Sequence, residues 1–342
     1  MNKITLGKTN LVIEKNGFGC LPIQRISEQD AVNLLHKAYD GGINFFDTAR
    51  AYSDSEQKVG AAFSAMRDKI VLATKTGAQT AEGFRKDLET SLRTLKTDYI
   101  DIYQFHNPAF CPKPGGEDGL YDAALEAKKQ GKIRHISITN HRLAVAHEAI
   151  DSGLYETLQF PFSYLAGEQE MELVRKCRET NMGFIAMKGM AGGLIRDGFT
   201  AAAWMAQQDG VVPIWGVQRE NELDQFLQCI REDVELTDER KATIERDRKE
   251  LCGEFCRGCG YCMPCPAGIE INQCARMSLM LRRAPAKEWL TEQWQQKMHR
   301  IEECRHCGHC TSKCPYGLNT PELLQANYKD YWQVLAQSKE EK

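Results

Sequence analysis

The chain has 342 residues, 42% hydrophobic and 27% charged, a composition typical of a globular protein long enough for more than one domain. With a net charge of −3, the chain has no overall basic character that would suggest nucleic acid as a partner. No apolar run approaches the roughly 20 residues of a membrane-spanning helix. Residues 1–8 also lack the apolar stretch of a secretory signal, so the sequence predicts a cytoplasmic protein.

Residues 1–235 alternate short apolar runs with amphipathic segments. A small hairpin is expected over residues 4–14, covering the bottom of the fold. The expected strands follow at 17–21, 44–47, 70–75, 99–106, 133–138, 157–159, 183–187 and 211–216. Apolar side chains at helical spacing lie between them, as at Phe84, Leu88, Leu92 and Leu95. Eight strand–helix units with short connections predict an α/β fold, a (β/α)8 TIM barrel. A doubly wound sheet is less favoured because no Gly-x-Gly-x-x-Gly follows the first strand.

Polar residues stand at the carboxyl ends of successive predicted strands, where barrel enzymes place their sites. Asp47, Lys75 and His106 each end a strand, and Tyr52 lies in the loop after the first of these. A nearby ammonium favours the phenolate of tyrosine, so we expect Lys75 to lower the pKa of Tyr52, with Asp47 orienting the lysine. His106 is suited to orienting a carbonyl oxygen. Each residue alone is more often structural, but together they predict acid/base chemistry on a carbonyl or alcohol.

These motifs resemble the aldo-keto reductase signature. The resemblance rests on Gly42-Ile43-Asn44-Phe45-Phe46-Asp47-Thr48-Ala49 with Tyr52 and Ser55-Glu56, on Lys75 and His106 after their strands, and on Gly131-Lys132-Ile133-Arg134. It implies that Tyr52 is the general acid/base, that Asp47 and Lys75 tune it, and that His106 orients the substrate. It also implies a nicotinamide across the barrel mouth, contacted by Thr139, Asn140, Gln159, Met187, Gly192, Gly216 and Gln218.

The nicotinamide contacts depart from the family pattern at several positions. Met187 stands where the family has a stacking tyrosine, and Glu222 stands near the place of an arginine that binds the 2′-phosphate of NADPH. NADPH-specific contacts are therefore weak. Three alternatives stay open: use of NADH or weak use of NADPH, electron delivery through iron–sulfur clusters with or without a flavin, and a redox-neutral reaction.

The C-terminal part is rich in cysteine. Residues 236–250 form a charged segment expected to be a helical linker, and ten of the 14 cysteines lie in residues 252–314. Disulfides are rare in a reducing cytosol, so a dense block of cysteines indicates metal ligation. Residues 251–342 are predicted to form a mainly helical ferredoxin-like domain that ends in a long helix.

Two motifs organise this block. Cys304-x2-Cys307-x2-Cys310-x3-Cys314-Pro315 is the bacterial ferredoxin run, in which the fourth cysteine ligates the other cluster. Cys256-x2-Cys259-x2-Cys262-x2-Cys265-Pro266 is one residue shorter. The pattern predicts two [4Fe–4S] clusters, one held by Cys256, Cys259, Cys262 and Cys314, the other by Cys265, Cys304, Cys307 and Cys310. The shorter spacing leaves Cys252 or Cys274 open as a replacement for Cys265. Structural zinc is the less favoured alternative.

The sequence predicts an oxidoreductase of the aldo-keto reductase subgroup that carries a ferredoxin-like module, acting on a small carbonyl or alcohol. A redox partner protein is expected to exchange electrons with the clusters. Two other hypotheses stay open: an electron-transfer subunit whose barrel is a docking scaffold, and a cluster module that acts as a structural staple or redox sensor.

Overall fold

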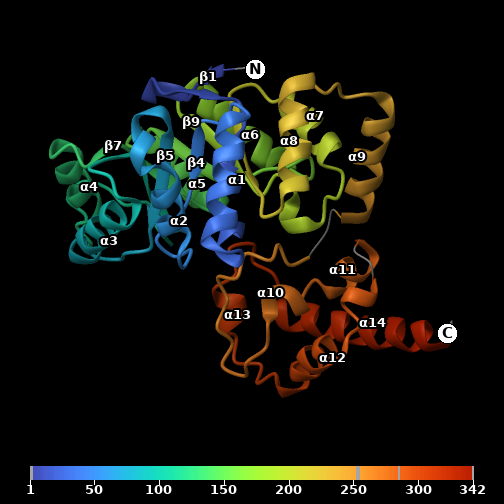
Figure 1. Ribbon diagram of the computed structural model, residues 1–342. Helices are drawn as coiled ribbons and strands as arrows, with labels where there is room; N and C mark the ends of the chain where they lie inside the picture. Colours follow the sequence, from blue (N-terminus) through green and yellow to red (C-terminus); the bar gives the residue numbers. More distant parts are fainter. Residues whose placement is uncertain (1–2, 252–254, 284–285, 341–342) are drawn as a thin grey trace. The chain divides into compact units, whose positions relative to one another are not determined.

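The computed structural model describes residues 3–251, 255–283 and 286–340 (Figure 1). They form two compact units. The barrel unit comprises Met1–Gly189 and Asp197–Lys241, and the cysteine unit comprises Met190–Arg196 and Ala242–Lys342. The domain boundaries predicted at residues 235 and 251 stay predictions. Among the described residues, none of the helices has the length and apolar character needed to cross a bilayer.

The barrel unit confirms the predicted (β/α)8 barrel. Its eight parallel strands close in the order β10-β3-β4-β5-β6-β7-β8-β9. The strands are β3 Gly17–Gly19, β4 Phe45–Asp47, β5 Val71–Thr76, β6 Ile100–His106, β7 Ile133–Thr139, β8 Thr157–Pro161, β9 Gly183–Met187 and β10 Val211–Gly216. Nearly every residue of these strands is buried, because a parallel sheet is covered on both faces, and this explains why they read as continuous apolar runs.

Helices follow the strands around the barrel (Figure 1). They are α1 Glu28–Asp40, α2 Ser55–Phe63, α3 Ala81–Leu95, α4 Leu120–Lys129, α5 Leu143–Ser152, α6 Glu168–Glu179, α7 Gly198–Ala206 and α8 Glu220–Glu232. Helix α3 shows why they form. Thr80 caps its first turn by accepting a hydrogen bond from the Gly83 amide at 3.2 Å. The predicted apolar positions of α3, from Phe84 to Leu95, are all buried.

The N-terminal hairpin covers the bottom of the barrel, as predicted. Strands β1 (Lys3–Thr5) and β2 (Val12–Glu14) pair antiparallel. Leu6 and Ile13 pack in one cluster with barrel side chains such as Phe45 and Ile102. The Lys8 amide donates to the carbonyl oxygen of Asn181, which precedes β9, at 2.7 Å. These contacts close the amino ends of the strands and leave the carboxyl ends for the polar residues.

The cysteine unit is helical, with long loops that carry the cysteines. Its helices are α9 Asp238–Leu251, α10 Ile271–Cys274, α11 Met277–Arg283, α12 Glu292–His299, α13 His309–Ser312 and α14 Thr320–Glu340. Helix α9 begins in the barrel unit and continues into this one. Helix α14 packs against α10, α11, α12 and α13. Asn327, a buried residue of α14, joins this helix to α11 and to the residue that follows α10. Its side chain accepts a hydrogen bond from the Ser278 amide at 2.7 Å and donates one to the Ala275 carbonyl oxygen at 3.2 Å.

Candidate functional site

Asp47 and Lys75 form a buried ion pair at the carboxyl ends of β4 and β5. The distance from Lys75 Nζ to Asp47 Oδ2 is 2.5 Å, and both residues are at most 3% exposed. Lys75 Nζ also donates to the Thr48 carbonyl oxygen at 2.7 Å, and Gln104 Nε2 donates to Asp47 Oδ1 at 2.9 Å. The ammonium and the carboxylate are therefore fixed in position by hydrogen bonds on both sides.

Tyr52 and His106 lie beside this pair. The Lys75 ammonium is 5.1 Å from the centre of the Tyr52 ring, and the Tyr52 and His106 rings meet edge to face at 5.8 Å. The structure thus brings together the four residues predicted as catalytic.

The expected direction of the Tyr52 pKa is wrong. Burial of the phenol, followed by the negative charge of Asp47, raises the pKa of Tyr52. Lys75 does not produce the predicted lowering, since its charge is balanced by the carboxylate 2.5 Å away. Burial, with the charge of Lys75, lowers the pKa of His106 to about 3. Near neutral pH, Tyr52 is therefore a protonated phenol and His106 is a neutral imidazole.

A polar network holds the loop that carries Tyr52. Ser55 Oγ donates to the Cys20 carbonyl oxygen and lies next to Thr48 Oγ1, both at 2.8 Å. Glu56 is 1% exposed; it accepts from Thr74 and Ser91 hydroxyls at 2.7 and 2.8 Å and pairs with Arg50. The Ser55-Glu56 part of the signature therefore positions the loop.

Two residues near this site were not predicted. Cys20 is fully buried after β3, and burial and the charge of Asp47 raise its pKa well above the ordinary value. His141 is 3% exposed, and its pKa is lowered well below the ordinary value by burial and by the charges of Lys188 and His106. Neither residue belongs to a spacing pattern, so only the folded chain reveals their position.

The predicted nicotinamide contacts differ in whether their polar atoms already have hydrogen-bond partners. Gln159 is fully buried, and within the described residues neither its amide nitrogen nor its amide oxygen has a hydrogen-bond partner. Asn140 is engaged: its Nδ2 donates to the Pro108 carbonyl oxygen at 2.8 Å, and its Oδ1 accepts from the amides of the next two residues. Thr139 is buried at the end of β7, and Met187 is half-buried at the end of β9. An unpartnered buried amide at Gln159 fits a carboxamide ligand, because buried polar groups need partners.

A phosphate site in the region after β10 would need a cation, but the side chain there is the carboxylate of Glu222. Glu222 Oε2 accepts from the amides of Gln218 and Arg219, both at 3.1 Å, and so caps the first turn of α8. A helix N-terminus with free amides attracts phosphate, but here the amides are occupied by the protein's own anion. Gly216, at the end of β10, is exposed. Gly192, another predicted contact, belongs to the cysteine unit.

The second cysteine motif surrounds a cavity. Cys265, Cys304, Cys307 and Cys310 all line one space of about 400 Å³, together with His309 and several apolar side chains. We call these four the second cysteine group. Although Cys265 is 39 positions before Cys304, the fold brings it to the same cavity. The exchange of the fourth ligand stays a prediction.

The remaining predicted ligands, Cys256, Cys259, Cys262 and Cys314, form the first cysteine group. Cys256 and Cys262 are buried. Burial raises the pKa of Cys256, and the charges of Cys259 and Cys314 raise it further. The Gly258 amide donates to Cys256 Sγ at 3.4 Å. Cys310 of the second group also acts on the pKa of Cys262, so the two groups are neighbours.

Cys274, one of the two alternative ligands, is not among the residues that line the cavity of the second cysteine group. Cys274 is fully buried, and its thiol donates to the Lys297 carbonyl oxygen at 3.9 Å; Cys252 lies outside the described residues. In the part of the chain that the structure describes, no group of three or more His, Cys, Asp or Glu side chains is arranged to bind a single metal ion. A cubane instead takes its cysteines at separate corners, around a space such as the one between Cys265 and Cys304.

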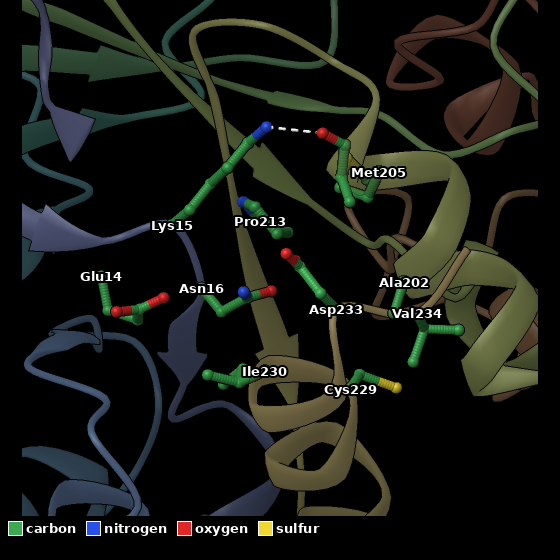
Figure 2. Close-up of a pocket in the computed structure, with 11 residues that line it drawn as sticks. Glu14, Lys15, Asn16, Ala202, Met205, Pro213, Cys229, Ile230, Asp233 and Val234 are labelled. Carbon is green, nitrogen blue, oxygen red and sulfur yellow. Dashed lines mark hydrogen bonds between the residues drawn. The ribbon is translucent and has the colours of Figure 1, made fainter. Parts of the chain in front are cut away.

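A further hollow of about 480 Å³ lies on the floor of the barrel. Figure 2 shows Lys15, Asn16, Pro213 and Asp233 around it, and Lys15 Nζ donates to the Ala206 carbonyl oxygen at 2.7 Å. Burial lowers the pKa of Lys15. The hollow is on the side of the strands' amino ends, where barrel residues support stability and not catalysis.

Comparison with known proteins agrees with both units. Residues 3–203 match the model of the aldo/keto reductase family, and residues 255–319 match that of a 4Fe-4S dicluster domain. An uncharacterized oxidoreductase of Bacillus subtilis is 30% identical over 211 residues, covering 58% of this chain and 67% of that protein. L-galactose dehydrogenase of Arabidopsis thaliana is 30% identical over 215 residues, covering 56% and 66%. An aldo-keto reductase of Bacillus halodurans, solved in its holo form, is 25% identical with a TM-score of 0.63, covering 72% of this chain and 96% of that one.

Proposed function

Because the chain belongs to the aldo/keto reductase family and carries a 4Fe-4S dicluster domain, we propose that Tyr52 is the general acid/base of an oxidoreductase that interconverts a carbonyl and an alcohol. We further propose that two [4Fe–4S] clusters exchange electrons with a partner protein. The observation that carries the first proposal is the buried Asp47–Lys75 pair beside Tyr52 and His106.

The protonation states favour reduction of a carbonyl. A protonated Tyr52 donates its phenolic proton to the substrate oxygen, which becomes the hydroxyl of the alcohol. The neutral imidazole of His106 donates one N–H hydrogen bond that orients the same oxygen. The proton transfer leaves Tyr52 as a phenolate whose ring centre lies 5.1 Å from the Lys75 ammonium. Oxidation of an alcohol uses the same groups in the reverse direction.

A bound nicotinamide supplies or accepts the hydride. The residues of the barrel unit proposed to contact it are Thr139, Asn140, Gln159, Met187, Gly216 and Gln218, and the unpartnered amide of Gln159 supports a carboxamide there. Glu222 blocks the amides that a 2′-phosphate would use, so we propose NADH rather than NADPH. A flavin carrier between hydride and single electrons stays open.

The clusters are proposed to be held by the two cysteine groups. The shared cavity of Cys265 and the Cys304–Cys310 motif supports the second, and the electrostatic coupling of Cys256 with Cys259 and Cys314 supports the first. Clusters of this kind transfer single electrons. The proximity of the two groups within one unit is suited to passing an electron from one to the other.

The test is substitution of the phenol. In cluster-replete Tyr52→Phe protein, NADH-dependent reduction of 4-nitrobenzaldehyde should fall by about 10²–10⁴, the usual contribution of a general acid. The matched control is Tyr39→Phe, because Tyr39 packs its ring on Phe63, away from the ion pair. Full activity of the Tyr52 variant would contradict the enzyme proposal. If wild-type protein reduces no carbonyl but its clusters still pass electrons, the barrel is a docking scaffold.

A further inference from the structure

Arg276 is a buried cation in the cysteine unit, between α10 and α11. It is 7% exposed. Its Nη1 donates to the Gly192 carbonyl oxygen at 3.0 Å and its Nη2 to Gln273 Oε1 at 3.1 Å. Its Nε is buried and has no hydrogen-bond partner among the described residues. Two of the three guanidinium nitrogens are thus fixed by the protein, while the third is left for another acceptor.

The guanidinium lies against the loop of the first cysteine group. A Cβ atom added to Gly258 would be 2.8 Å from Arg276 Cζ, a distance that real Cβ atoms do not adopt. Gly258 stands between Cys256 and Cys259, has a φ of +65°, and donates its amide to Cys256 Sγ. Glycine at this position therefore allows the cation to approach the sulfur-bearing loop closely.

Both hydrogen-bond acceptors of this cation are neutral, since Gly192 and Gln273 supply an amide oxygen each. Arg282, a few residues later, makes a two-pronged pair with Asp330, at 2.6 Å for each bond. An unpaired buried charge is costly unless a negative charge lies near. The first cysteine group supplies one, because the guanidinium lies against Gly258, whose amide donates to Cys256 Sγ.

We propose that Arg276 is a positioning residue for the first cluster: its Nε–H donates to a sulfur of that cluster, and its charge raises the cluster's reduction potential above that of the second. Hydrogen bonds to sulfur, nearby charge and solvent exposure are the factors by which a protein sets such potentials. A single electron that enters the unit then reduces the first cluster, held by Cys256, Cys259, Cys262 and Cys314. This inference rests on the proposed clusters and not on the carbonyl chemistry.

The second cysteine group differs in its surroundings. Cys307 is exposed, and Arg305 is exposed to solvent as well, so charges there are screened. His309 lines the cavity, and its Nε2 is buried without a partner among the described residues. An imidazole donates one hydrogen bond without the permanent charge of a guanidinium. The first cluster alone is therefore expected to have a buried fixed cation.

The experiment is an anaerobic redox titration of the full chain with dithionite, followed by electron paramagnetic resonance. We expect two midpoint potentials in the wild-type protein. Arg276→Gln should weaken the electron affinity of the higher-potential cluster by tenfold or more, which is about 59 mV for a one-electron couple. Arg276→Lys should recover part of that shift. Arg282→Gln, the matched control on an exposed arginine, should leave both potentials unchanged.

The possible results separate this inference from the proposed function. If iron-replete wild-type protein shows no cluster signals, the proposal that the chain binds two clusters is wrong. Full cluster content in Arg276→Gln with both potentials unchanged, or both shifted equally, would overturn the role of Arg276 alone. If the variants do not retain iron, wild-type protein labelled with ¹⁵N-arginine provides the test. Nitrogen coupling to the higher-potential cluster supports the proposal, and lack of any coupling overturns it.

Discussion

Lys75 Nζ lies 2.5 Å from Asp47 Oδ2, and neither side chain is more than 4% exposed. Removal of one partner from a buried pair leaves an uncompensated charge, so Asp47→Ala should lower the free energy of unfolding by about 3–5 kcal/mol. Urea unfolding followed by tryptophan fluorescence measures this. The exposed pair of Lys132 and Glu89 is the control, and Glu89→Gln should cost less than about 1 kcal/mol. Equal losses in the two variants would contradict the argument.

The lowered pKa of His106 predicts loss of stability in acid. In the folded protein His106 stays neutral down to a pH of about 3, whereas in the unfolded chain it takes up a proton near pH 6.5. Between these values the unfolded state binds more protons, so stability falls as the pH falls. In His106→Asn, the loss in unfolding free energy between pH 7 and pH 5 should therefore be smaller, by up to about 2 kcal/mol.

The control for this effect is His299, which is exposed in α12. His299→Asn should show the same pH dependence as the wild-type protein in the same urea titrations. A wild-type dependence in His106→Asn would mean that the imidazole takes up its proton at the same pH in the folded and unfolded states. His141, with its own lowered pKa, acts in the same direction and remains in both variants.

The barrel strands were predictable because a strand that is buried on both faces appears in the sequence as a short, mostly apolar run, as at Ile100–His106. The catalytic four were predictable because each stands at or just after a strand end. The neighbours Cys20 and His141 also follow strands but were not predicted, since neither belongs to a motif or a spacing pattern. The direction of the Tyr52 pKa was wrong for a related reason: the sequence places an ammonium nearby but does not reveal that a carboxylate already balances it.

Glu222 predicts a preference for NADH that a single substitution should change. The carboxylate holds the amides of Gln218 and Arg219, so Glu222→Lys frees them and supplies a cation. A charged hydrogen bond contributes about 1.5–3 kcal/mol, so the ratio of kcat/KM for NADPH over NADH should rise roughly 10- to 100-fold. Steady-state kinetics with 4-nitrobenzaldehyde measures the ratio.

The control for this substitution is Glu220→Lys, which makes the same charge change in the same turn. Glu220 pairs with Lys37 at 2.6 Å and does not bond the amides before the helix. An equal gain in NADPH use by the two variants would indicate a general effect of charge. No gain in Glu222→Lys would remove Glu222 from the specificity argument.

The shortened motif left the fourth ligand of the second cluster undecided, because spacing along the chain does not say which distant cysteine meets Cys304. The shared cavity identifies Cys265 as the candidate, whereas the Cys274 thiol bonds the Lys297 carbonyl oxygen. Cys265→Ser should therefore lose about half of the bound iron and one of two resonance signals, since each cubane depends on all its thiolates. Cys274→Ser should keep both clusters and lose only some stability. Iron analysis of the reconstituted proteins decides this, and the reverse result would make Cys274 the ligand. Full iron content in both variants would direct attention to Cys252, for which Cys252→Ser is the corresponding test.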